Sequence, residues 1–222
     1  MLTDRQCFFC ATLMYGVSLV YSVFLWRKGF RKDDRINYVL LLAGFTMHTV
    51  AMFMRGFSFN RCPVNNLFEA TMFVNWSAVG AYLILGLWPK IRSLGAFASP
   101  IFVFLGIYAL MPGLDHHDAD GEMTKNGIVS LHAVLILISY AGFGLCAVAS
   151  CMYLLQERNL KKHNIFAVTS VLPPIQRLES VAGKLLVASL ILLTGGLSLA
   201  PMLVGDKDGL IFYQDAKILW SM

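Results

Sequence analysis

Residues 128–155 read IVSLHAVLILISYAGFGLCAVASCMYLL, a run without a single aspartate, glutamate, lysine or arginine. A membrane-spanning helix needs about 20 mostly apolar residues, because the hydrocarbon layer is about 30 Å thick and each helical residue rises about 1.5 Å. The run is continuous and does not alternate, and a lone span must satisfy its own backbone hydrogen bonds, so a helix is favoured over a strand. Residues 128–155 therefore predict a transmembrane helix.

The same pattern recurs along the chain. Of its 222 residues, 57% are hydrophobic and 14% are charged, whereas a soluble domain is about half apolar and about a quarter charged. We therefore expect an all-α fold, a polytopic transmembrane helix bundle that forms a single domain of about six spans. The spans are expected near residues 7–26, 37–54, 67–88, 94–112, 128–155 and 184–204.

Lysine and arginine collect on one side of these spans. The stretches 27–36, 89–93 and 156–183, together with Lys184, hold 12 of the 18 basic residues. The positive-inside rule places these stretches in the cytoplasm and both the N-terminus and the C-terminus outside. We expect a multi-pass protein of the cell inner (plasma) membrane, surrounded by lipid. A nucleic-acid partner is not expected despite the net charge of +5, because the cations lie in interhelical stretches and not on one polar face.

Two histidines fall inside predicted spans, where an ionisable side chain is costly and is a candidate for function. His48 lies in the outer half of the second span, seven residues before Arg55. Its imidazole could ligate haem iron or a metal, or it could hydrogen-bond another helix. His132 lies about one turn inside the outer end of the fifth span. That depth suits an axial ligand to haem at the membrane surface, and equally a neutral histidine that caps its helix.

A polar segment precedes the third span. Asn65 and Asn66 follow Pro63 in a turn that can cap a helix beginning near Leu67. Glu69 and Trp76 lie seven residues apart and share a helix face. A carboxylate this close to hydrocarbon needs a partner, which Arg55 or Arg61 could supply. The segment could be an anchored loop alone, or Trp76 could offer a shelf for a flat aromatic ligand.

The stretch Asp115-His116-His117-Asp118-Ala119-Asp120 superficially suggests a metal site. Adjacent histidines do not easily share one ion in regular geometry, and acid-rich outer loops are common solvated linkers. We therefore interpret this stretch as a linker, because spacing alone is weak support for a metal site.

Several blocks occur in a defined order along the chain. They are Gly44-Phe45-Thr46-Met47-His48 with Arg55, Cys62-Pro63-Val64-Asn65-Asn66-Leu67-Phe68-Glu69 through Trp76, Leu131-His132 with Tyr140 and Gln156-Glu157-Arg158, Leu172-Pro173-Pro174 with Leu178-Glu179, and Asp215-Ala216-Lys217 before Trp220. Together these blocks resemble the cytochrome c assembly family of membrane proteins, the CcsA/ResC and HemX-like group. The second block is similar to that family's Pro-x-x-Asn-x-[Phe/Tyr]-Glu…Trp stretch.

The resemblance implies a membrane assembly factor for c-type cytochromes that binds or presents haem at the outer face. It implies haem iron as the metal and His132 as its ligand. From the residues themselves, we add His48, Trp76 and Glu69 as candidate cofactor-binding residues. The implied partners are haem and apocytochrome c or other assembly proteins. Such haem delivery makes no bonds, so an enzyme is not expected. The alternative that the resemblance allows is a HemX-like scaffold or regulatory protein that binds a partner and no haem.

The resemblance also bears on the C-terminal region. Members of the family carry a tryptophan-rich WWD segment before an Asp-Pro-Lys, where this chain has residues 209–214 followed by Asp215-Ala216-Lys217. Members also continue through further spans, so we expect the chain to be incomplete at its C-terminus. A small-solute transporter is disfavoured, because no matched pair of broken helices is visible.

Overall fold

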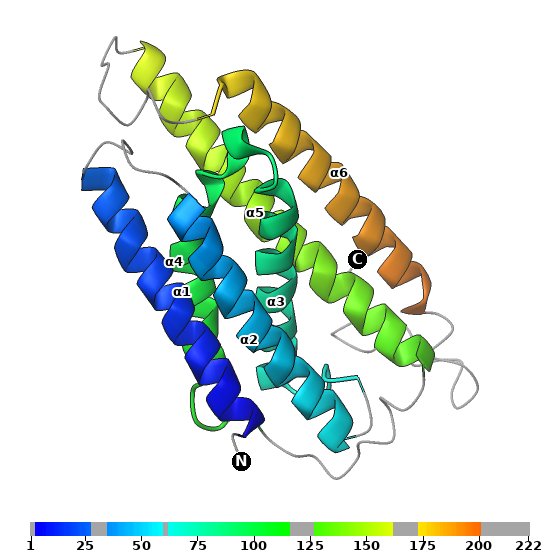
Figure 1. The fold of residues 1–222 in the computed structure, drawn as a ribbon. Coiled ribbons are helices and arrows are strands. Elements are labelled where there is room, and N and C mark those ends of the chain that lie inside the picture. Colours follow the sequence, from blue (N-terminus) through cyan, green and yellow to red (C-terminus); the bar gives the residue numbers. More distant parts are fainter. Residues whose placement is uncertain (1–2, 28–34, 60–61, 116–126, 162–172, 201–222) are drawn as a thin grey trace.

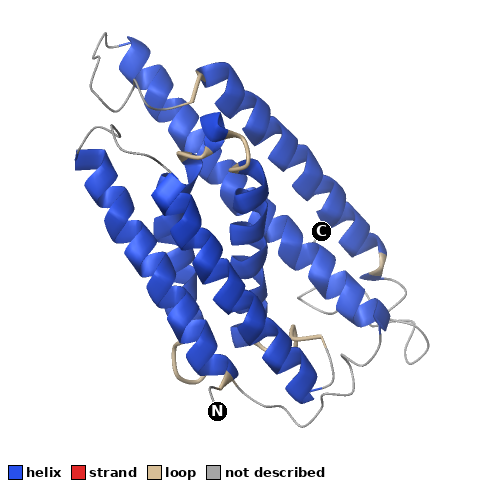
Figure 2. Cartoon of the chain, viewed as in Figure 1, coloured by secondary structure: helices blue, strands red, loops and turns tan. Residues whose placement is uncertain are grey.

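The computed structural model describes residues 3–27, 35–59, 62–115, 127–161 and 173–200. These residues are helical and contain no strand (Figures 1 and 2), which confirms the predicted all-α bundle. The elements are α1 (Asp4–Arg27), α2 (Arg35–Phe59), α3 (Leu67–Leu85), the 3-10 turn η1 (Pro89–Ile91), α4 (Leu94–Ala109), α5 (Gly127–Lys161) and α6 (Ile175–Ser198).

Each of the six predicted spans corresponds to one of these α-helices, but one of the helices is shorter than its predicted span. Five of the helices are long and apolar enough to cross a membrane. The exception is α4, whose 16 residues give a length of about 24 Å, less than the hydrocarbon thickness of about 30 Å. The prediction of a span over 94–112 was too long, because α4 ends at Ala109 and the chain then turns through Gly113 with a φ of 94°.

The helix boundaries near the C-terminal hairpin also differ from the prediction. The sequence predicted that the last span covers 184–204, whereas α6 begins at Ile175 and is continuous to Ser198. Nothing between Glu179 and Lys184 breaks a helix, because a single internal glycine costs only about 1 kcal/mol. The helix ends at Ser198, and Leu199 is its C-cap residue.

Consecutive helices run in opposite directions, so the bundle has two distinct ends (Figure 1). The starts of α1, α3 and α5 and the ends of α2, α4 and α6 form what we call the Arg55 end, and the opposite end is the Lys161 end. Helix α1 packs against α2 and α4, α3 packs against α4 and α5, and α6 packs chiefly against α5. The described residues of the cation-rich stretches lie at the Lys161 end, which the positive-inside rule predicts to be cytoplasmic.

Candidate functional site

At the Arg55 end, one guanidinium is bonded to three carboxylates. Arg55 is 3% exposed, and its Nε donates to Glu69 Oε1 over 2.8 Å while Nη1 donates to Asp4 Oδ2 over 2.9 Å. It also donates to both oxygens of Asp115. We call these four residues the Arg55 cluster. They come from α2, α3, α1 and the segment after α4, so a single arginine joins four parts of the chain.

The start of α3 is fixed by the same cluster. Asn66 is the N-cap residue, and its Oδ1 accepts a hydrogen bond from Glu69 N over 2.8 Å. Glu69 Oε2 accepts from Asn65 N over 2.8 Å, and Asn66 Nδ2 donates to Asp115 Oδ1 over 2.9 Å. The predicted cap before Leu67 and the predicted Arg55 partner of Glu69 are both confirmed. Both carboxylate oxygens of Glu69 accept hydrogen bonds and the residue is fully buried. In this structure, Glu69 therefore holds the loop before α3 against Arg55.

His48 lies inside the bundle and not on its surface. It is fully buried, and its Nδ1 lies 3.1 Å from the Tyr15 hydroxyl of α1. The Phe8 ring packs against the imidazole with a centroid distance of 4.8 Å. This is the helix–helix hydrogen bond that the sequence offered as one of its alternatives. Nε2 is buried and has no hydrogen-bond partner in the described part of the chain, so the imidazole retains one unused nitrogen.

Trp76 faces α2. Its Nε1 donates to Thr49 Oγ1 over 2.9 Å, and its ring stacks on Phe45 with a centroid distance of 5.4 Å and an interplanar angle of 20°. The two rings line an apolar groove of about 520 Å³ that also reaches Ile138 of α5. The ring of Trp76 thus packs on Phe45 and lines this groove, and its role as a shelf for a flat ligand stays a prediction.

His132 lies in the second turn of α5 and faces the end of α6. Its Nδ1 is 2.8 Å from the carbonyl oxygen of Gly196. A carbonyl only accepts, so Nδ1 carries the proton and the neutral ring keeps its lone pair on Nε2. The Gly196 carbonyl lies in the last turn of α6 and also accepts a hydrogen bond from Leu199 N over 3.1 Å. A carbonyl oxygen has two lone pairs, so it can accept from both donors. The side chain is half-buried, between apolar neighbours on α5.

The two helices approach closely at this hydrogen bond. A Cβ atom placed on Gly196 would lie 2.9 Å from Ile136 Cγ1 and 3.3 Å from Leu135 Cβ, whereas one placed on Gly195 meets nothing within 4 Å. Real Cβ contacts essentially never fall below about 3 Å, so only glycine fits at position 196 without a shift of α6. The position of His132 thus depends on a glycine from another helix.

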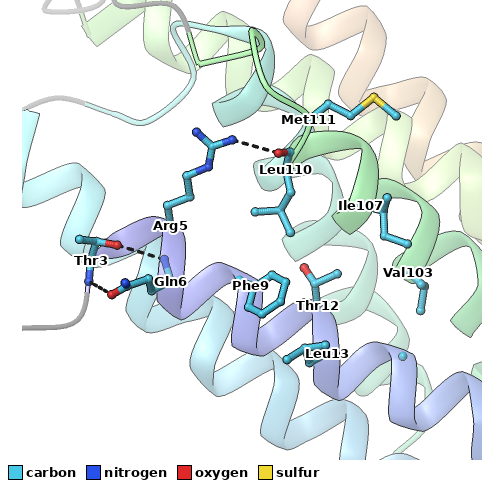
Figure 3. Close-up of a pocket in the computed structure, with 11 residues that line it drawn as sticks. Thr3, Arg5, Gln6, Phe9, Thr12, Leu13, Val103, Ile107, Leu110 and Met111 are labelled. Atoms are coloured by element: carbon cyan, nitrogen blue, oxygen red, sulfur yellow. Dashed lines mark hydrogen bonds between the residues drawn. The ribbon is translucent and has the colours of Figure 1, made fainter.

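A separate groove of about 760 Å³ opens between α1 and α4 at the Arg55 end (Figure 3). Phe9, Leu13, Val103 and Ile107 line it, and no histidine is among its lining residues. Arg5 stands at one end, where its Nη2 donates to the Leu110 carbonyl over 2.9 Å (Figure 3). The groove therefore supplies mainly apolar surface and no imidazole.

The four candidate residues are not gathered into one pocket. Glu69 belongs to the Arg55 cluster, His48 lies in the core against Tyr15, Trp76 lines the groove with Phe45, and His132 lies against α6. His116 and His117 lie outside the described residues. The sequence missed three contributions, those of Asp4, Asp115 and Gly196. The sequence predicted Asp115 to be part of the solvated linker. An acidic residue directly after a predicted span is a signal that could have indicated a cationic partner for Asp115.

These features define a multi-pass membrane helix bundle with a buried ion-pair cluster at one end and a hydrogen-bonded histidine near that end. A sequence profile described as "Cytochrome C assembly protein" matches residues 64–199. Because that match covers more than half of the chain, the protein belongs to the cytochrome c assembly family. The matched segment contains Glu69, Trp76 and His132.

Individual relatives agree with this membership. The chain is 26% identical to the protein HemX of Brevibacillus brevis, over 94% of this chain and 76% of that protein. It is 26% identical to the cytochrome c biogenesis protein CcsA of Pyropia yezoensis, over 70% of this chain and 49% of the relative. It is also 26% identical to the protein NrfI of Wolinella succinogenes, over 80% of this chain but 19% of that longer protein.

Proposed function

We propose that this protein handles haem at the outer face of the inner membrane during the assembly of c-type cytochromes, with His132 as an axial ligand of the haem iron. Haem is the cargo in this proposal. The chain coordinates and presents it without making or breaking a covalent bond. Apocytochrome c or another assembly protein would receive it. Membership in the cytochrome c assembly family supports the class of cargo.

The observation that carries the proposal is the hydrogen bond from His132 Nδ1 to the Gly196 carbonyl. Histidines that ligate metals almost always donate their other ring N–H to a carbonyl or carboxylate, which fixes the tautomer and the ring orientation. His132 already has this second bond, so the lone pair of Nε2 is committed to no other role in the described residues. The donor chemistry therefore fits an iron ligand.

The surroundings of His132 suit a porphyrin at a membrane surface. Ile128 and Leu131, on the same first turns of α5, are 45% and 50% exposed. Apolar side chains near the helix end can lie against the ring while the propionates reach water. The Arg55 cluster supports this arrangement indirectly, because it fixes the loops at the same end of the bundle. We propose a positioning role there for Glu69, and we retain Trp76 as a candidate shelf for a flat ligand.

A haem titration tests the proposal. The full chain, purified in detergent, is expected to give a saturable Soret band at stoichiometric haem, because a neutral imidazole is a strong ligand for haem iron. The absorption spectrum is recorded at increasing haem concentration and compared with haem in detergent alone. A spectrum that never departs from that of free haem would overturn the proposal, and it would favour the scaffold or regulatory role that the HemX-like resemblance also implies.

The bond to Gly196 gives a second, sharper prediction. Gly196→Leu is expected to push the end of α6 away from Ile136 and to break the His132–Gly196 hydrogen bond while His132 itself remains. Loss of such a supporting bond typically lowers metal affinity about 10–100-fold, so haem affinity should fall by that amount. Gly195→Leu is the matched control, because a Cβ atom at this position meets nothing within 4 Å. Equal haem affinity in the two variants would contradict the role of Gly196.

A further inference from the structure

A groove at the Lys161 end of the bundle combines two cations with an apolar floor. It has a volume of about 640 Å³ and lies between α6 and the corner formed by the end of α3 and η1. Arg177, Ser180 and Lys184 line one side at helical spacings of three and four, which places them on one face of α6. Nothing in the proposed haem site requires this groove, because it is at the opposite end of the bundle.

In the described part of the chain, the two cations have no acidic partner. No aspartate or glutamate is among the residues that line the groove, and within the described ranges neither Arg177 nor Lys184 forms an ion pair. Lys161, at the same end, differs in this respect, since its Nζ is 2.7 Å from Glu157 Oε1. Arg177 and Lys184 thus present a paired positive charge that an anion from outside the chain can neutralise.

The remaining lining indicates what kind of anion fits. Leu85, Val181, Leu185 and Ala188 continue the groove along the apolar part of the bundle. Trp88, which is 54% exposed, stands beside the cations, and tryptophan typically marks the level of lipid headgroups. A small anion such as free phosphate would use the cations and leave the apolar part empty, whereas a phospholipid would use both.

We propose that this groove is a binding site for an anionic phospholipid, whose phosphate is held by Arg177 and Lys184 and whose acyl chain lies along Val181 and Leu185. Basic pockets between transmembrane helices on the cytoplasmic side are suited to anionic headgroups. The groove of Figure 3 does not share this character, because its one cation, Arg5, already donates to the Leu110 carbonyl.

Lipid retention by the purified full chain tests the proposal. Native mass spectrometry is performed with phosphatidylglycerol and phosphatidylcholine of identical acyl chains. The wild-type chain is expected to retain phosphatidylglycerol preferentially. A cation near a membrane surface typically contributes about fivefold in affinity, so Arg177→Gln with Lys184→Gln should weaken phosphatidylglycerol binding roughly 25-fold. Equal retention of both lipids by the wild-type chain would overturn the proposal.

Two further variants test whether the lipid binds in this groove. They distinguish such binding from nonspecific attraction to basic residues and from binding of free phosphate. Arg158→Gln with Lys161→Gln removes the same charge at the same end of the bundle but outside the groove, and phosphatidylglycerol should be retained as in the wild type. Ala188→Phe fills the apolar part without changing charge and should reduce retention. Equal losses in the two charge variants, or displacement of the lipid by millimolar inorganic phosphate alone, would contradict a built phospholipid site.

Discussion

Arg55→Met should lower the stability of the protein by about 3–5 kcal/mol, because removal of one member of a buried ion pair leaves the other charge without compensation. Glu69 is fully buried, and Asp4 and Asp115 are 27% and 15% exposed. The methionine fills much of the space of the arginine stem, so the loss comes mainly from the uncompensated carboxylates. Denaturant titration of the two proteins in detergent measures the difference in their free energy of unfolding.

Second-site variants distinguish charge from packing at this position. Combining Arg55→Met with Glu69→Leu should recover part of the lost stability, because replacing a buried pair by apolar groups is often neutral. Arg158→Met, on the exposed part of α5 near the Lys161 end, should change stability by no more than about 0.5 kcal/mol. If Arg55→Met unfolds at the same denaturant concentration as Arg158→Met, the cluster does not hold this end of the bundle together.

His132→Ala should abolish the saturable Soret band, since it removes the proposed iron ligand together with its lone pair on Nε2. The reduction in haem affinity should exceed the roughly 10–100-fold loss expected for the supporting Gly196 contact alone. Free imidazole added to His132→Ala should restore part of the band, because it can occupy the space of the missing ring. The measurement is again a haem titration, with the denaturant midpoint recorded to show that the variant is folded.

Two other histidine variants make this experiment decisive. His163→Ala removes an imidazole from the stretch predicted to be cytoplasmic and should leave the Soret band unchanged. His48→Ala should lower stability because it breaks the contact with Tyr15, but it should preserve haem affinity. A Soret band that persists in His132→Ala and disappears in His48→Ala would transfer the ligand role to the buried histidine.

Much of the fold could be predicted from the sequence because its signals are local. Each span is a run long enough to cross hydrocarbon, and no tertiary contact is needed to recognise it. The cap at Asn66 was also predictable, since the capping oxygen and the amide of Glu69 are three residues apart. The start of the last span near residue 184 was predicted wrongly, because α6 already begins at Ile175. The polar residues Gln176, Arg177 and Glu179 lower the apolar character of this stretch, but its backbone is helical.

The contacts at the candidate site could not be predicted in the same way. Asp4 and Asp115 reach Arg55 across 51 and 60 residues of sequence, and only the packing of three helices brings them together. His48 lies on a helix that is apolar on most sides, so the face that meets Tyr15 is not marked by hydrophobic periodicity. The Gly196 carbonyl accepts from both Leu199 N and His132 Nδ1, and the sequence does not mark which carbonyl of α6 meets the imidazole, because that depends on how α6 packs against α5.

The pairing of α6 with α5 has a mechanical consequence. The imidazole and the carbonyl that orients it both belong to this hairpin, whereas the arginine and its carboxylates belong to α1, α2, α3 and the segment after α4. A rigid tilt of the hairpin would carry the imidazole toward or away from those loops with its own orientation intact. The orientation of the His132 imidazole is therefore set inside the hairpin, whereas its distance from the Arg55 cluster depends on how the hairpin packs against the other helices. If His132 binds haem as we propose, a change in that distance alone would move the haem without turning the imidazole.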